Sequence, residues 1–89
     1  MKDARPLGGF KKDLKRIQKR HWDLIKLHDI IALLQAGAVL PISAHPHKLS
    51  GEHAGRWECH VEPDWLLIYE VYEDEILLVR TGSHADLFE

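Results

Sequence analysis

The hydrophobic periodicity of this chain changes once along its length, from helical spacing in the first half to strand-like alternation in the second. Apolar residues recur every three to four positions over 10–20 and again over 24–36, which predicts two amphipathic helices. Alternation and β-branched or aliphatic runs over 57–61, 66–72 and 76–80 predict three antiparallel strands. An α+β fold follows, with an N-terminal helical hairpin packed on one face of the sheet.

Local signals set the ends of the second helix and the extent of the segment after it. Asp23 is a favourable N-cap residue, and Gly37 stands where a left-handed residue ends many helices. Between residues 37 and 55, glycine, proline, serine and histidine occur without periodicity, so a long loop is expected. Connections of this length in compact domains are usually functional.

Chain length and composition limit the classes of protein to which this sequence can belong. Eighty-nine residues, 45% of them hydrophobic, suffice for one small domain, which we assign to residues 1–89. The apolar runs are far shorter than the ~20 residues that cross a bilayer, and the first residues lack the apolar core of a secretory signal. Cys59 is the only cysteine and alternates with apolar strand positions, so an inert buried thiol is expected. We expect a cytoplasmic protein without membrane contact.

The net charge of −2 conceals an asymmetry between the two halves of the chain. Residues 1–48 hold ten Lys and Arg against four acids, a net +6, and residues 49–89 hold two against ten, a net −8. Much of the positive charge lies on one face of the first predicted helix: Lys11, Lys12, Lys15, Arg16, Lys19 and Arg20. Such a face suits the phosphates of a nucleic acid, unless the two halves neutralise each other across the fold.

The second half concentrates side chains that suit acid–base chemistry. The candidates for one site are His47, His60, Asp64 and His84, with Arg80 and Phe88 nearby. Strand alternation turns His60 away from the apolar side of its strand, onto the open side of the sheet. Histidine donates or accepts a proton near neutral pH, and arginine presents phosphate with a fork of donors. Two structural alternatives stay open: solvated surface histidines, and an Arg80 that simply pairs with one of the ten acids around it.

A metal site is a competing interpretation of the same residues. Three histidines and a carboxylate would suit zinc, but the sequence has no HExxH or CxxC motif and no helical pair of ligands. We therefore predict no metal and no cofactor.

Three ordered strings resemble the YafQ-type branch of the RelE/ParE toxin superfamily. They are His47-x-Leu49-x-Gly51, Trp57-Glu58-Cys59-His60-Val61-Glu62-Pro63-Asp64-Trp65-Leu66-Leu67-Ile68-Tyr69 and Leu78-Val79-Arg80-Thr81-Gly82-Ser83-His84-Ala85-Asp86-Leu87-Phe88. The resemblance spans about Phe10 to Phe88. It implies the RelE-like microbial RNase fold, with two helices against a mainly antiparallel sheet of three to four strands. It also implies the toxin of a type II toxin–antitoxin pair, a ribosome-dependent endoribonuclease that cuts mRNA in the decoding site.

The resemblance assigns cleavage to six residues and RNA contact to one neighbour. The cleavage residues are His47, His60, Asp64, Arg80, His84 and Phe88, and the neighbour is Trp65. Metal-independent cleavage by the 2′-hydroxyl needs a base, an acid and positive charge on the phosphorane. We expect His84 to be the general acid and His60 the base or its partner. Asp64 orients an imidazole, and His47 assists from the loop. Arg80 holds the non-bridging oxygens, and Phe88 stacks on a base.

The resemblance also implies partners. These are a cognate antitoxin, mRNA, the decoding site of the small ribosomal subunit, and a toxin–antitoxin heterotetramer that binds operator DNA. The basic helix face is expected to contact ribosomal RNA. The alternative is a ParE-like toxin of DNA gyrase, but such relatives lack the histidine and acid cluster. The family's first strand falls on Pro6-Leu7-Gly8-Gly9, a poor strand sequence, so we expect it to be shortened, displaced or altered.

Overall fold

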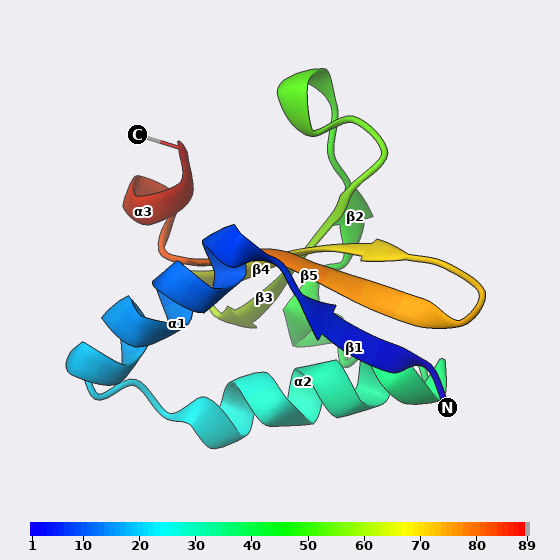
Figure 1. The fold of residues 1–89 in the computed structure, drawn as a ribbon, viewed down its shortest axis with the longest axis horizontal. Coiled ribbons are helices and arrows are strands. Elements are labelled where there is room, and N and C mark those ends of the chain that lie inside the picture. The colour runs from blue at the N-terminus through cyan, green and yellow to red at the C-terminus, as the bar shows by residue number, and fades with distance from the viewer. Residues whose placement is uncertain (89) are drawn as a thin grey trace.

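The computed structural model describes residues 1–88, which form a five-stranded sheet with helices on both sides (Figure 1). The elements in chain order are β1 (Asp3–Pro6), α1 (Gly8–Lys19), α2 (Leu24–Ala36), β2 (His47–Lys48), β3 (Trp57–Glu62), β4 (Trp65–Val71), β5 (Glu75–Gly82) and α3 (His84–Phe88). The strand order is β1-β5-β4-β3-β2. Strand β1 runs parallel to β5, and the other neighbours are antiparallel. The predicted α+β class is confirmed, whereas the sheet has five strands instead of three or four.

The helical hairpin forms as the apolar spacing predicts. Helix α1 buries Phe10 and Ile17, and α2 begins after Asp23, whose carboxylate accepts a hydrogen bond from the Ile25 amide at 3.0 Å. Gly37 ends α2 in the left-handed region, with φ of 66°, where a side chain would be strained. Both predicted ends of α2 are therefore confirmed.

The two strands outside the three that alternation predicts are the edges of the sheet. Strand β1 pairs with β5 from Asp3 opposite Glu75 to Pro6 opposite Leu78. Proline is tolerated there because an edge strand leaves one row of amides unpaired. The family's first strand is thus displaced toward the N-terminus, and Gly8 begins α1 instead. Strand β2 is a two-residue segment inside the predicted long loop, which also contains short 3-10 turns at Ile42–Ala44 and Gly51–His53.

The core lies between the helical hairpin and one face of the sheet. Its sheet side is formed by apolar residues of β3, β4 and β5, among them Cys59, Leu67, Tyr69 and Leu78. Burial raises the pKa of the Cys59 thiol to about 12, which keeps it protonated and inert as predicted. In Figure 1, α1 and α2 run beneath the sheet, whereas α3 and the loop between β2 and β3 rise above it. Within residues 1–88, no helix is long and apolar enough to cross a membrane.

Candidate active site

The register of the sheet places three predicted site residues on one face. One line of paired residues crosses four strands: His47 in β2, Glu58 in β3, Ile68 in β4 and Arg80 in β5. His60 lies two residues beyond Glu58 in β3, and residues two apart share a face of a strand. Strand spacing and rise put the His47 and His60 backbones roughly 8 Å apart. This face is opposite the helix-covered core.

The turn between β3 and β4 brings Asp64 to the start of α3. The His84 amide donates a hydrogen bond to Asp64 Oδ1 at 3.1 Å, and the His84 ring Nδ1 lies 3.6 Å from the same oxygen. Both side chains are exposed, at 60% for His84 and 72% for Asp64. The carboxylate therefore holds the start of α3 and lies next to the His84 ring.

His60 is tied to the turn that carries Asp64. Its ring Nδ1 lies 3.2 Å from the carbonyl oxygen of Pro63. A carbonyl oxygen only accepts, so the contact assigns the proton to Nδ1 and leaves Nε2 as the basic nitrogen of a neutral ring. The His45 ring stands edge-on to His60 at 6.0 Å between centroids. His60 also lines an open pocket of about 610 Å³, whose wall includes the ion pair between Lys26 and Glu62.

His47 lies in the edge strand β2, next to β3, and is held by two neighbours. Its Nδ1 donates to the carbonyl oxygen of His45 at 2.9 Å, and its Nε2 is 3.6 Å from Oε1 of Glu58. Glu58 is only 5% exposed, although strand alternation predicts a polar, open position. Sequence reasoning missed this carboxylate. Its place two residues before His60, on the same side of β3, was the available signal.

Phe88 connects α3 with the loop on the other side of the site. Its ring is 5.6 Å from the His84 ring and 5.9 Å from the His53 ring. With 43% of its surface exposed, Phe88 presents an aromatic face to solvent beside His84. His53 is half-buried beside Phe88.

Arg80 does not pair with an acid of the second half. Its Nε and Nη2 donate to the two carboxylate oxygens of Asp13 in α1, at 2.6 and 3.0 Å. These hydrogen bonds raise the pKa of Arg80 further above its ordinary value. Arg80 therefore forms an ion pair, but its partner comes from the basic helix and not from the ten acids of the second half.

Trp65, predicted to contact RNA, is buried in the structure. Its side chain is 1% exposed, its Nε1 donates to Thr81 Oγ1 at 2.9 Å, and its ring packs on Trp22 at 5.1 Å. The Thr81 hydroxyl in turn donates to the Leu66 carbonyl at 2.8 Å. Trp65 therefore supports the β3–β4 turn from below and offers no surface to a nucleotide.

The six basic residues of α1 divide into two groups. Arg20 forms a bidentate pair with Asp86 at 2.6 and 2.9 Å, and Arg16 lies 3.6 Å from the same carboxylate. The remaining four are exposed and form no ion pair with residues 1–88: Lys11, Lys12, Lys15 and Lys19. The two halves of the chain thus neutralise each other in part, and a row of lysines stays available.

Asp86 ties α3 to α1, and this link is expected to weaken in acid. The Arg20 hydrogen bonds hold the pKa of Asp86 well below its usual range, with further help from Ser83. A carboxylate with a depressed folded-state pKa contributes stability above its unfolded pKa and loses it as pH falls through the folded value. Asp86→Asn should therefore lower the free energy of unfolding by about 1–3 kcal/mol at pH 7. The difference from the unsubstituted chain should shrink below about pH 4.

Urea unfolding of both proteins between pH 7 and pH 2.5 measures this difference. Asp29→Asn, at an exposed position of α2, is the matched control and should change the free energy of unfolding by less than about 0.5 kcal/mol. A difference between Asp86→Asn and the unsubstituted chain that stays constant across the pH range would contradict the assignment.

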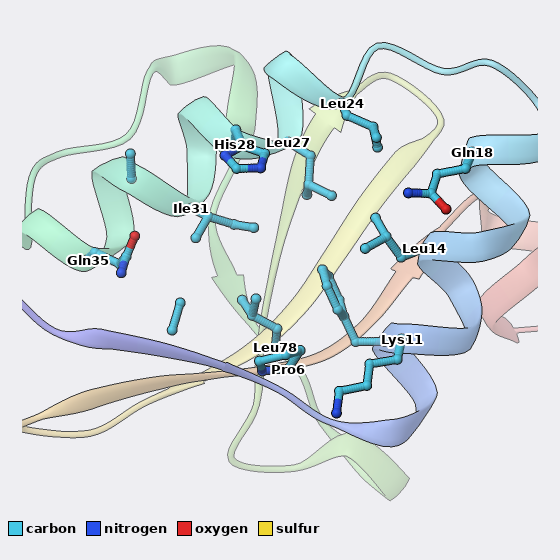
Figure 2. A pocket seen from close by; sticks show the side chains of 13 residues that line it. Pro6, Lys11, Leu14, Gln18, Leu24, Leu27, His28, Ile31, Gln35 and Leu78 are labelled. Atoms are coloured by element: carbon cyan, nitrogen blue, oxygen red, sulfur yellow. The ribbon is translucent and has the colours of Figure 1, made fainter.

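A second pocket, of about 490 Å³, lies between β1, α1 and α2 and is separate from these residues. Figure 2 shows Leu14, Leu24 and Ile31 lining it, with Lys11 and His28 on opposite sides. No hydrogen bond or ion pair joins Lys11 to His28 in the described chain, so the pocket offers no acid–base pair. Among residues 1–88, no three His, Cys, Asp or Glu side chains are grouped to hold a metal ion.

Comparison with known proteins agrees with this geometry. The family model described as "Bacterial toxin of type II toxin-antitoxin system, YafQ" matches residues 2–89. The mRNA interferase toxin YafQ of Escherichia coli K12 is 41% identical over 88 residues, which cover 98% of this chain and 96% of that protein.

Solved structures of the E. coli toxin superpose closely on this chain. The crystal structure of YafQ from strain BL21(DE3) has a TM-score of 0.92 at 39% identity, with both chains covered completely. The toxin in the E. coli DinJ–YafQ toxin–antitoxin complex has a TM-score of 0.89 at 40% identity, covering 99% of this chain and 98% of that one. On the family match, the identity and the shared fold together, this chain belongs to the YafQ family of bacterial type II toxin–antitoxin toxins.

Proposed function

We propose that this chain is an mRNA interferase, a ribosome-dependent endoribonuclease that cleaves mRNA in the cytoplasm without a metal ion. Its E. coli relative is named an mRNA interferase toxin, and family membership supports the same activity here. The observation that carries the proposal is the His84–Asp64 pair next to His60, at one end of the face that also holds His47 and Arg80.

The reaction requires two proton transfers on opposite sides of one phosphate. The 2′-hydroxyl attacks the adjacent phosphorus after a base removes its proton, and the bond from phosphorus to the 5′-oxygen breaks as an acid protonates that oxygen. The products are a 2′,3′-cyclic phosphate and a 5′-hydroxyl. His60 suits the base because its Pro63 contact leaves Nε2 to accept the proton. His84 suits the acid because its exposed ring lies at the start of α3, 3.6 Å from the carboxylate of Asp64.

The remaining residues bind the substrate around these two rings. Arg80 stabilises the negative charge on the phosphorane, which is the largest electrostatic demand of the reaction. His47 assists from β2, where Glu58 and the His45 carbonyl fix its ring. Phe88 stacks on a base next to the scissile phosphate, a contact worth roughly 1–3 kcal/mol.

Cleavage of defined mRNA on programmed ribosomes, with and without a zinc-selective chelator in a buffer that retains Mg²⁺ for the ribosome, tests this function. Cleavage with a 2′,3′-cyclic phosphate end is expected to be unchanged by the chelator. Loss of cleavage with the zinc chelator would instead support the zinc alternative. Intact mRNA in both arms together with inhibited DNA gyrase would support the ParE-like alternative.

We propose that the exposed lysines of α1 contact ribosomal RNA, while Arg16 and Arg20 hold α3. Replacing all four lysines with alanine should weaken binding to small ribosomal subunits. It should also make the salt dependence shallower by up to about 3 in log–log slope, since each phosphate contact contributes about 0.7–0.9. Equilibrium binding over a salt series measures both. A quadruple lysine-to-arginine variant keeps the charge and should bind as before, and unchanged affinity of the alanine variant would exclude this contact.

We further propose that a cognate antitoxin neutralises this toxin, as the DinJ–YafQ complex of the relative suggests. Two toxins and two antitoxins would form a heterotetramer that binds operator DNA. Co-purification with the product of an adjacent small reading frame, followed by mass measurement of the complex, tests this arrangement.

A further inference from the structure

Asp13 is a buried carboxylate inside an otherwise basic helix. It is 1% exposed and accepts hydrogen bonds from Arg80 Nε and Nη2 and from the Thr81 amide, at 2.6, 3.0 and 3.1 Å. Arg16 adds a longer contact at 3.5 Å. A buried charge is tolerated only when it is fully paired, and here every partner except Arg16 belongs to the end of β5.

The contact uses only one edge of the Arg80 guanidinium. Asp13 occupies Nε and one proton of Nη2, and Nη1 makes no hydrogen bond within residues 1–88. A guanidinium has five N–H donors in a planar fork, so the opposite edge remains for a phosphate. The side chain is 33% exposed, so part of it reaches solvent. The ion pairs around Arg80 also leave a net positive charge, because they link three arginines, Arg16, Arg20 and Arg80, with only two carboxylates, Asp13 and Asp86.

Gly9 lets α1 approach the Arg80 stem closely. A Cβ at Gly9 would lie 2.8 Å from Arg80 Cδ and 3.3 Å from the Val79 carbonyl oxygen, whereas a Cβ at Gly8 would meet nothing within 4 Å. Gly9 and Asp13 are four residues apart and so lie on one face of the helix. One turn of α1 therefore contacts the stem of Arg80, and the next turn holds its guanidinium.

We propose that Gly9 and Asp13, together the Arg80 cradle, position the Arg80 guanidinium toward the scissile phosphate, with Asp13 as a positioning residue. This inference rests on the proposed role of Arg80 in cleavage. A guanidinium without the cradle would sample several rotamers, and small misplacements of a group that acts in the transition state lower kcat strongly. Substrate binding on the ribosome depends on many other contacts, so KM should change little.

Single-turnover and steady-state cleavage of mRNA on programmed ribosomes tests the cradle in a double-substitution cycle. Asp13→Asn is expected to lower kcat by about 10- to 100-fold with KM nearly unchanged. Arg80→Ala should lower kcat at least as much, and adding Asp13→Asn to Arg80→Ala should cause no further loss. A merely structural Asp13 would lower activity by the same factor in both backgrounds, which would overturn the proposal.

Gly9→Ala tests the cradle without removing a charge, and it serves if Asp13→Asn fails to fold. Alanine favours the helix yet displaces the Arg80 stem, so kcat should fall about 10-fold or more in a protein that still folds, as thermal unfolding checks. Gly8→Ala is the matched control and should retain full kcat.

The outcomes separate this inference from the proposed function. If Arg80→Ala cleaves normally, the role of Arg80 in cleavage is wrong and the cradle with it. If Arg80→Ala is inactive while Gly9→Ala and Asp13→Asn both cleave normally, only the cradle is overturned.

Discussion

His84→Ala is expected to lower mRNA cleavage on programmed ribosomes by about 10²- to 10⁴-fold, because it removes the proposed general acid. The fold should be unaffected, since the ring is 60% exposed and exposed substitutions usually change the free energy of unfolding by less than about 0.5 kcal/mol. The backbone amide that donates to Asp64 is retained in alanine, so α3 keeps its start. Measured on the same preparation, the cleavage rate should therefore fall while the free energy of unfolding from urea titration stays nearly unchanged.

His28→Ala supplies the control for this loss. His28 is also an exposed histidine, but it lies on α2 beside the separate pocket. Its replacement should leave cleavage unchanged. The pH dependence gives a second criterion, because the loss of an acid removes one limb of a bell-shaped rate profile. A His84→Ala protein that keeps both the rate and both limbs would refute the assigned role.

Trp65→Ala, unlike His84→Ala, is expected to have its largest effect on the stability of the fold. Removing a fully buried aromatic side chain costs about 3–5 kcal/mol, a large part of the roughly 5–15 kcal/mol that holds a small domain together. The variant also leaves Thr81 without its indole partner and Trp22 without its packing surface. Thermal and urea unfolding should show a protein close to the limit of folding.

Trp65→Phe and Phe88→Ala distinguish support of the site from contact with RNA. Phenylalanine at 65 keeps most of the buried ring and loses mainly one hydrogen bond, so a loss of about 1 kcal/mol and near-normal cleavage at low temperature are expected. Phe88→Ala removes an exposed ring and should reduce cleavage with little change in unfolding. Impaired ribosome binding by a folded Trp65→Phe protein would support direct contact between Trp65 and RNA.

The helices were predictable from sequence because their signals are local. The N-cap of Asp23 and the left-handed Gly37 each depend on residues within one turn of the helix. Strands β1 and β2 carry no such signal. Strand β1 has four residues, and its partner is β5, about 70 positions later, while β2 has only two residues, too few to show alternation.

The site was predictable in its residue types but not in its contacts. The conjunction of His60, Asp64 and His84 follows from matching strings, whereas the pairing of Asp64 with His84 depends on how α3 returns to the β3–β4 turn. The burial of Asp13 could have been predicted from its position in the sequence. It stands three residues after Phe10 and four before Ile17, on the apolar face of α1, where an unpaired charge would be costly.

The parallel pairing of β1 with β5 makes the fold depend on the part of the chain that is synthesised last. Asp3 through Pro6 obtain their strand partner only when residues 75 to 78 have been made, and Asp13 obtains Arg80 later still. Contacts of such wide sequence separation form slowly and late. A nascent copy therefore has no completed nuclease centre while most of it is still being translated. Under the proposed function, a toxin that cleaves mRNA on translating ribosomes is thus kept from maturing early on the ribosome that produces it.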